Sequence, residues 1–186
     1  WGTWGQVGWS SVLLDRYVRY FVFFMVTGTP ASYTLSLHDA LPIFRDGVHL
    51  GVAVATPAGL IVPIVRDADR RSLLDVAREV SRLAVAARDR SIRPEELRGG
   101  TFTVSNYGSL GGRFASPIVR PPEVGIMGFG SVRERPIVVK GVVEARPTLP
   151  ICFGADHRLV DGDLSVAFQE CVKSLLSDPM PLLVGG

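Results

Sequence analysis

Residues 148–162 read TLPICFGADHRLVDG, and this stretch decides how the chain is expected to fold. Its first eight residues carry no charge and are mostly apolar, which predicts a buried strand over 148–155. A charged turn follows and ends at Gly162, after which Asp163 stands where a helix cap is expected. The apolar stripe of that helix comprises Leu164, Phe168, Val172 and Leu175. The stretch therefore predicts a strand, a tight turn and a helix in succession.

Upstream, the segment 49–65 predicts two further strands. Residues 49–55 are short and apolar, and residues 57–59 (PAG) supply a turn before a second apolar run over 60–65. Pro63 cannot donate a ladder hydrogen bond, so the second strand is expected at a sheet edge or at a bulge.

A helix is predicted to follow this pair of strands. Ser72 and Asp75 lie three positions apart, which is a weak form of the capping box. The apolar residues recur at helical spacing and comprise Leu73, Ala77, Val80, Ala84 and Ala87. Residues 94–96 (PEE) fit the first turn of a short second helix.

The middle of the chain alternates between strand and loop patterns. Residues 101–105 (TFTVS) are a β-type run that leads into a glycine-rich loop over 108–112. Residues 124–132 predict a buried strand, and residues 140–141 (KG) predict a two-residue hairpin turn between strands 137–139 and 142–144. Strands mixed with helices indicate one α/β (α+β) sandwich and not separate domains.

Composition excludes several classes of function. Hydrophobic residues make up 47% of the 186 positions and the net charge is +2, so nothing indicates nucleic acid or an anionic membrane as partner. The apolar run over 17–26 is shorter than the roughly 20 residues that span a bilayer. Cys152 and Cys171 form no CxxC pair, which argues against a zinc site or a disulfide framework and favours a reducing compartment.

The turn over 155–162 (ADHRLVDG) contains the residue best suited to chemistry. His157 stands there between Asp156 and Arg158, with Asp161 four positions further on. A lone histidine is usually a structural or surface residue. A strand end that leads through a tight turn into a capped helix can nevertheless hold a reactive side chain rigidly.

Four blocks of this sequence resemble the catalytic domain of the E2 acyltransferases of 2-oxo acid dehydrogenase complexes, in the order and spacing of that family. DHRLVDG is similar to the family's DHRxxDG motif. The blocks are GVAVATPAGLIVPIVRDADRRSL (51–73), GGTFTVSNYGSLGG (99–112), PPEVGIMGFG (121–130) and PTLPICFGADHRLVDG (147–162). The resemblance covers residues 44–186, which are identified as a partial, N-terminally truncated catalytic domain of this family.

The resemblance implies roles for three residues in acyl transfer between dihydrolipoamide and coenzyme A. His157 matches the family's general base, which deprotonates the attacking thiol. Ser105 matches a hydroxyl that stabilises the oxyanion, although an ordinary strand-end hydroxyl is the alternative. Asp161 matches the motif's second acidic position; it either pairs with a basic group to hold the loop or satisfies free amides at a helix N-terminus. No residue for binding coenzyme A is assigned, and no metal is expected.

The family resemblance also implies a fold and a set of partners. The expected fold is the two-layer sandwich of chloramphenicol acetyltransferase, with a mixed sheet flanked by helices. A homotrimer would divide the site between chains and build a larger cubic core that gathers the E1 dehydrogenase and the E3 lipoamide dehydrogenase. Coenzyme A is the expected co-substrate, and the lipoyl group would sit on a lipoyl domain absent from this chain. Such complexes lie in the bacterial cytoplasm or the mitochondrial matrix; whether the acyl group is acetyl, succinyl or branched-chain stays open.

Two other functions compete with this one. Chloramphenicol O-acetyltransferase is the nearest enzymatic alternative, but that family has histidine at the position of Asp156 and lacks the blocks at 99–112 and 121–130. A catalytically inactive fragment with a structural or assembly role is the alternative from a different class.

Residues 1–43 match nothing in the family, and residues 32–43 (SYTLSLHDALPI) resemble the translation of a sequencing adaptor. One interpretation is an assembly artefact joined to a genuine acyltransferase gene, and the other is a divergent N-terminal helix. Under the first interpretation the isolated chain is expected to be poorly soluble, because its aromatic residues stay partly exposed, and inactive, because the basic partner expected for Asp161 is missing.

The artefact interpretation predicts that resequencing across the Ile43–Phe44 junction will not reproduce the codons for residues 32–43. The measurement is a long read from unligated genomic DNA. An uninterrupted read that contains these codons contradicts the interpretation.

Overall fold

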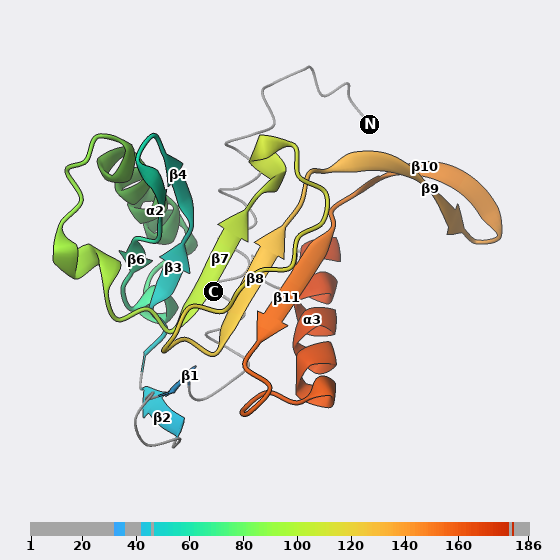
Figure 1. The fold of residues 1–186 in the computed structure, drawn as a ribbon. Helices are drawn as coiled ribbons and strands as arrows, with labels where there is room; N and C mark the ends of the chain where they lie inside the picture. The colour runs from blue at the N-terminus through green and yellow to red at the C-terminus, as the bar shows by residue number, and fades with distance from the viewer. Residues whose placement is uncertain (1–31, 36–41, 46, 179, 181–186) are drawn as a thin grey trace.

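The computed structural model describes residues 32–35, 42–45, 47–178 and 180 (Figure 1). Its centre is a five-stranded mixed sheet with strand order β11-β8-β7-β3-β6. Those strands are β3 (Leu50–Val52), β6 (Ile64–Val65), β7 (Phe102–Asn106), β8 (Gly125–Phe129) and β11 (Ile151–Ala155). β7 lies parallel to both β3 and β8, whereas β11 and β6 close the two edges in antiparallel orientation.

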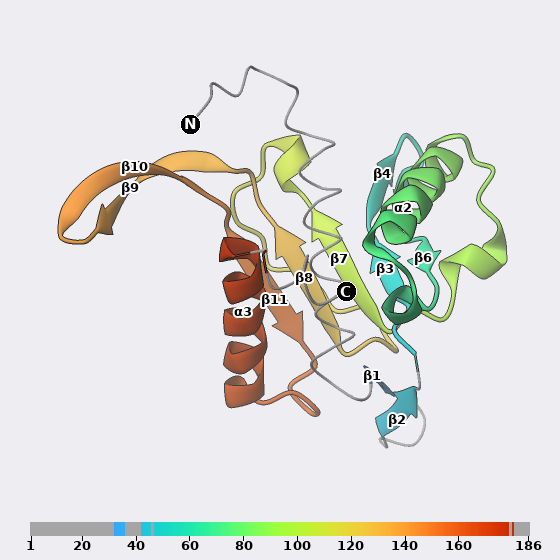
Figure 2. The ribbon, with the colours of Figure 1, turned by 180° about the vertical axis from the view of Figure 1, so that it is seen from behind.

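Three two-stranded ribbons accompany the central sheet. They are β1 (Ser32–Leu35) with β2 (Pro42–Arg45), β4 (Val54–Thr56) with β5 (Gly59–Ile61), and β9 (Arg133–Val139) with β10 (Val142–Thr148). The β9–β10 hairpin extends away from the sheet (Figure 2). Its turn residues Lys140 and Gly141 both have positive φ, of 49° and 82°, as the predicted two-residue turn requires.

Among the described residues, two long helices cover one face of the sheet, which confirms the two-layer sandwich. They are α2 (Leu73–Arg88) and α3 (Gly162–Ser177), and the short 3₁₀ helices are η1 (Ala68–Arg70), η2 (Pro94–Leu97) and η3 (Gly108–Leu110). A single buried core cluster contains Val76 and Leu83 from α2, Val172 from α3, and Val104 and Met127 from the sheet. Both helices therefore share one layer.

The helix α2 begins where the sequence predicts. The Ser72 hydroxyl accepts a hydrogen bond from the Asp75 amide at 3.1 Å and donates one to the Asp75 carboxylate at 2.6 Å. Its buried face is wider than predicted, because Val76 and Leu83 are fully buried beside the expected Ala77 and Val80.

An aromatic cluster fastens α3 to the sheet. The Phe168 ring lies 4.9 Å from that of Phe153 on β11 and 5.8 Å from that of Phe102 on β7, measured between centroids. Such pairs stabilise beyond their buried area by about 0.5–1.5 kcal/mol. Leu164, which was expected in the apolar stripe of α3, is exposed instead.

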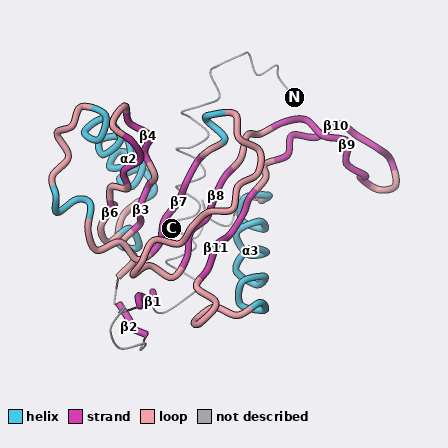
Figure 3. The backbone as a smooth tube through the Cα atoms, in the orientation of Figure 1, coloured by secondary structure: helices cyan, strands magenta, loops and turns pink. Residues whose placement is uncertain are grey.

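Side chains alternate across a strand, so the residues next to these aromatics face the other side of the sheet. Gly128, Cys152 and Gly154 lie on that second face. The segment between η3 and β8, drawn as loop in Figure 3, passes over it. A Cβ at Gly154 would lie 2.7 Å from the carbonyl oxygen of Pro117, so this close approach requires glycine.

We expect Gly154→Ala to destabilise the chain by about 1–3 kcal/mol, because the added methyl group meets backbone that must shift. The measurement is the urea midpoint of unfolding. Gly162→Ala is the matched control: a Cβ there meets nothing within 4 Å, and alanine favours the helix by up to about 1 kcal/mol. Equal midpoints for both variants would show that the loop over the sheet adapts freely.

Candidate active site

The turn that carries His157 joins β11 to α3. The Asp156 amide donates to the Val124 carbonyl at 2.9 Å, which continues the pairing of β11 with β8. The Asp156 carbonyl then accepts hydrogen bonds from the amides of Leu159 and Val160, both at 3.0 Å. His157 therefore lies within a hydrogen-bonded turn whose start is fixed to the sheet.

His157 is exposed, and its side chain makes no hydrogen bond or ion pair among the described residues. Histidine titrates near neutral pH and can accept a proton there when its nitrogen is free. The structure thus leaves this imidazole available to a substrate.

Asp161 caps α3 through its side chain. Its backbone is extended, with φ −81° and ψ 179°, and its Oδ1 accepts a hydrogen bond from the Leu164 amide at 3.4 Å. The predicted cap, Asp163, lies inside the first turn instead, so that prediction was wrong. No ion pair involves Asp161 in the described part of the chain.

Ser105 lies at the other end of the sheet, near the end of β7. It is half-buried, and its register partner on β8 is Gly128, which in turn pairs with Cys152 on β11. The Ser105 hydroxyl has no hydrogen-bond partner within the described ranges. It can therefore donate to a bound group.

The surroundings of Ser105 include two residues that the sequence did not single out. The Tyr107 hydroxyl and the Cys152 thiol are hydrogen-bonded at 3.1 Å. A Cβ at Gly128 would lie 2.7 Å from the Cys152 sulfur and 2.8 Å from the Tyr107 ring, so both occupy the space that glycine leaves free. Burial raises the pKa of Tyr107, and its hydrogen bond to Cys152 raises it further, which keeps the phenol protonated.

Ser105 and His157 do not meet within one chain. Ala155 pairs with Gly125, three residues before the Gly128 that pairs with Ser105, and His157 lies two residues beyond Ala155. Three strand residues span about 10 Å, and two strand spacings separate β7 from β11 by about 10 Å more. A base and an oxyanion donor that act on the same thioester must each come within hydrogen-bond distance, about 3 Å, of its reacting atoms. A site that uses both residues therefore needs a second copy.

A buried carboxyl group lies on the same face as Ser105 and was also missed. Glu123 is only 3% exposed, accepts a hydrogen bond from the Thr103 hydroxyl, and has Arg120 Nη1 3.7 Å from its Oε1. Burial raises the pKa of Glu123, against the opposing effects of Thr103 and Arg120. The Pro-Pro-Glu order before β8 was a visible signal, although nothing local indicates the partner Thr103, 20 positions away.

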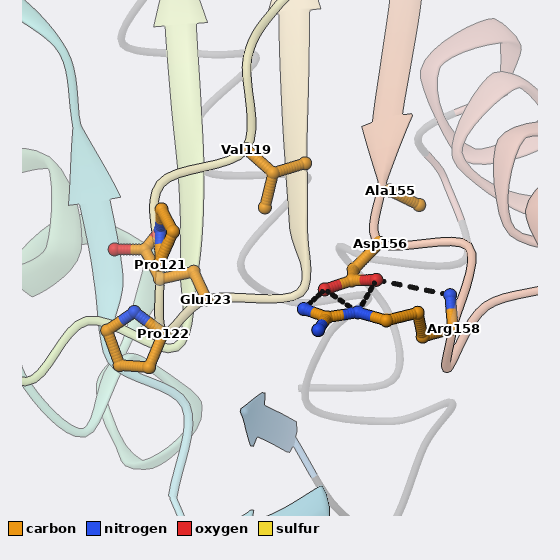
Figure 4. Close-up of a pocket in the computed structure, with 7 residues that line it drawn as sticks. All are labelled: Val119, Pro121, Pro122, Glu123, Ala155, Asp156 and Arg158. Carbon is orange, nitrogen blue, oxygen red and sulfur yellow. Dashed lines mark hydrogen bonds and ion pairs between the residues drawn. The ribbon is translucent and has the colours of Figure 1, made fainter. Parts of the chain in front are cut away.

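A small pocket of about 130 Å³ lies between the Glu123 loop and the His157 turn (Figure 4). Its lining comprises Val119, Pro121, Pro122, Glu123, Ala155, Asp156 and Arg158. Within the described ranges, no group of three or more His, Cys, Asp or Glu could hold a metal ion. None of the described helices is long and apolar enough to cross a membrane.

The glycine-rich loop 108–112 forms η3 and a tight turn at Gly111, which has φ 86°.

The family model and the most similar curated proteins indicate the same family. Residues 36–184 match the model of the 2-oxoacid dehydrogenases acyltransferase (catalytic domain). The succinyltransferase component of the 2-oxoglutarate dehydrogenase complex is 42% identical in Saccharomyces cerevisiae and 41% identical in Bartonella vinsonii. Each alignment covers 76% of this chain but only 31% and 34% of the relative, so the chain spans about a third of their length.

Solved structures agree with the sequence relatives. Azotobacter vinelandii dihydrolipoamide acetyltransferase, solved to study a catalytic serine, histidine and asparagine, superposes with a TM-score of 0.85 at 30% identity. The cubic core of a pyruvate dehydrogenase complex gives 0.85 at 31%; both alignments cover 92% of this chain and 71% of the other. A chloramphenicol acetyltransferase gives 0.53 at 15% identity, covering 88% and 77% of the two chains, and so shares the fold.

The two interpretations of Asp161 can be separated by substitution. As a helix cap, Asp161→Asn should leave the free energy of unfolding nearly unchanged, whereas Asp161→Ala should cost about 1 kcal/mol, because asparagine caps as well as aspartate. Urea unfolding measures both. A loss in the asparagine variant as large as in the alanine variant would show that the charge matters, as pairing with a basic group requires.

Proposed function

The chain belongs to the 2-oxoacid dehydrogenase acyltransferase catalytic-domain family, and from this we propose that it moves an acyl group between dihydrolipoamide and coenzyme A. The observation that carries the proposal is the turn that fixes His157 to the end of β11, exposed and without a side-chain partner among the described residues. Ser105 supports the proposal, because its hydroxyl also has no hydrogen-bond partner in the described part of the chain. The serine and histidine studied in the Azotobacter enzyme are 52 positions apart, the separation of Ser105 and His157 here.

The proposed chemistry is direct transfer between two thiols. A free thiol has a pKa near 8.5 and a histidine one near 6.5, so an imidazole can take the thiol proton at neutral pH. The resulting thiolate attacks the thioester carbonyl, and the Ser105 hydroxyl donates to the oxygen that becomes negative. One such donor is worth roughly 3 kcal/mol of transition-state stabilisation. The second thiolate then leaves and takes the proton from His157, without an acyl-enzyme.

We propose that a homotrimer completes each site, with His157 from one copy and Ser105 from its neighbour. The separation of the two residues along the sheet supports this arrangement. The β9–β10 hairpin supports it too, because this ribbon leaves the body and exposes apolar side chains on both of its faces, Val138 and Val143 on one and Ile137 and Val142 on the other. Assembly into a cubic core with E1 and E3 components follows as part of the same proposal, given the similarity to such a core.

Position 161 is a departure from the Azotobacter enzyme. The asparagine studied there follows the histidine by four positions, where this chain has Asp161. Both side chains can cap a helix, so the capping role accommodates either residue. We propose that Asp161 acts on the site by holding the start of α3.

Succinyl is the acyl group we propose to test first, since the relatives at 41–42% identity are succinyltransferases. The structural neighbours at 30–31% identity include an acetyltransferase, so acetyl is the comparison.

We also propose that residues 1–43 lie outside the native domain. The adaptor-like segment 32–43 supports this, whereas the described hairpin β1–β2 crosses the boundary, because Ser32 pairs with Arg45 and Tyr33 with Phe44. The family match begins at residue 36, and the structural alignments that cover 92% of this chain also extend into residues 1–43, so both oppose this proposal. A fragment with only an assembly role is the competing function, and activity of the full-length protein from the uninterrupted gene decides between them.

In that full-length protein, we expect His157→Ala to lower turnover by about 10²–10⁴ and Ser105→Ala by about 10²–10³. The reason is loss of the base and of the oxyanion donor, and the assay is transfer from succinyl or acetyl coenzyme A to dihydrolipoamide. Mixing the two variants should restore part of the activity, because hybrid interfaces contain intact sites.

Subunit exchange must be demonstrated in the mixture by mass spectrometry. Unchanged turnover in the His157 variant would refute the proposed function. Absence of recovery after proven exchange would refute the shared site alone, and an effect of Ser105→Ala confined to substrate affinity would assign that residue to binding.

A further inference from the structure

The residues on either side of His157 are joined to each other. Arg158 Nε lies 2.9 and 3.2 Å from the two carboxylate oxygens of Asp156, and Arg158 Nη2 lies 2.6 Å from Oδ2 (Figure 4). The Arg158 amide adds a fourth hydrogen bond, to Asp156 Oδ1 at 3.1 Å. The same carboxylate therefore holds both the backbone and the side chain of Arg158.

This pair restricts the backbone between its members, which is the backbone of His157. Asp156 is anchored by its amide to Val124, and its carbonyl holds Leu159 and Val160. Because the side chains of Asp156 and Arg158 are hydrogen-bonded to each other, the turn has little freedom to reorient the imidazole between them. Two-pronged arginine–carboxylate pairs add geometric specificity of this kind.

Stability alone does not account for the pair. Its side chains are 19% and 65% exposed, and ion pairs exposed to this degree contribute about 0–1 kcal/mol. Glu79 and Arg82 on α2 form a similar two-pronged pair, at 2.9 and 2.8 Å and with 22% and 49% exposure. That second pair lies on α2, away from the turn, and serves as a reference ion pair, although Arg82 there also donates to Glu96 Oε1 at 2.7 Å.

We propose that Asp156 and Arg158 are positioning residues that orient His157 for proton transfer. The proposal rests on the proposed function, in which His157 is the base. The pair acts as a neutral unit, so it holds the histidine without adding net charge beside it. Its hydrogen bond from Arg158 keeps the pKa of Asp156 below the ordinary value, so the pair persists at neutral pH.

Breaking the pair from its two sides should have opposite electrostatic effects. Asp156→Asn leaves an unpaired guanidinium beside the imidazole, and Arg158→Gln leaves an unpaired carboxylate. The other described charges near the turn stay the same in both variants; they are Asp161, Asp163, Arg120 and Glu123. The acid limb of the pH–rate profile should therefore move to lower pH in the first variant and to higher pH in the second.

The kinetic experiment compares Asp156→Asn, Arg158→Gln, Arg158→Lys and the control Glu79→Gln in the full-length protein. We expect kcat to fall at least tenfold in the first two with KM within threefold, since misplacing a reacting group costs rate more than binding. Arg158→Lys should recover part of the loss, and Glu79→Gln should stay within twofold. Equal kcat in all variants, or equal losses that include Glu79→Gln, would overturn the proposal.

A second measurement does not depend on activity. Diethyl pyrocarbonate modifies neutral imidazole, and peptide mass spectrometry separates the modified His157 from His49. The Nδ1 atom of His49 accepts a hydrogen bond from the Asp67 amide at 3.0 Å. At pH 6.5 the rate of modification of His157 should rise in Asp156→Asn, because more of the imidazole is neutral, and fall in Arg158→Gln, because less of it is. The rate of modification of His49 should stay unchanged. Equal His157 rates in all variants would overturn the proposal even if kcat falls. Activity that survives His157→Ala would instead refute the proposed function, and the two failures stay distinguishable.

Discussion

The pairing of β7 with β8 in parallel and of β8 with β11 in antiparallel orientation constrains everything else in this structure. Because of this pairing, β7 and β11 run in opposite directions, so their carboxyl ends lie at opposite ends of the sheet along the strand direction. Ser105 lies near the carboxyl end of β7, and His157 follows the carboxyl end of β11. No rotamer change can bring them together, because hydrogen-bonded register fixes the offset. A chemistry that needs both groups is therefore coupled to self-association.

The two faces of the sheet have different roles: one packs against the helices, and the other leaves space beside Ser105. One face carries Phe102, Val104 and Met127 against the helices and supplies the hydrophobic stabilisation. The other has glycine at positions 128 and 154, where backbone and the Tyr107 ring approach closely. Large side chains there would displace the loop that crosses the sheet. The second face thus keeps small residues beside Ser105, at the expense of the apolar area that larger side chains would bury.

Patterns that act over a few residues were sufficient to predict most elements. The Lys140-Gly141 turn and the Ser72 cap follow from local backbone preferences, and both are confirmed. The cap of α3 was assigned to Asp163 because two acidic residues flank Gly162, and only the extended backbone at Asp161 decides between them. The Tyr107–Cys152 and Thr103–Glu123 contacts join positions 45 and 20 apart, so periodicity could not reveal them. The motif around His157 could be recognised in the sequence. That Ser105 and His157 lie at opposite ends of the sheet depends on strand order and direction, which the sequence pattern does not reveal.

The aromatic cluster of Phe102, Phe153 and Phe168 connects the strand that carries Ser105 with the strand that leads to His157; these two residues are called the half-sites below. Phe102 lies on β7 three residues before Ser105, Phe153 lies on β11 four residues before His157, and Phe168 packs on both rings from α3. A helix whose centre packs against these rings cannot shift without disturbing both strands. The turn at His157 therefore moves with the sheet as one body. If catalysis joins half-sites from two copies, the distance between base and oxyanion donor is set by how the rigid bodies dock and not by local loop motion. Contacts far from the chemistry, such as those of the β9–β10 hairpin, then bear directly on the reacting geometry.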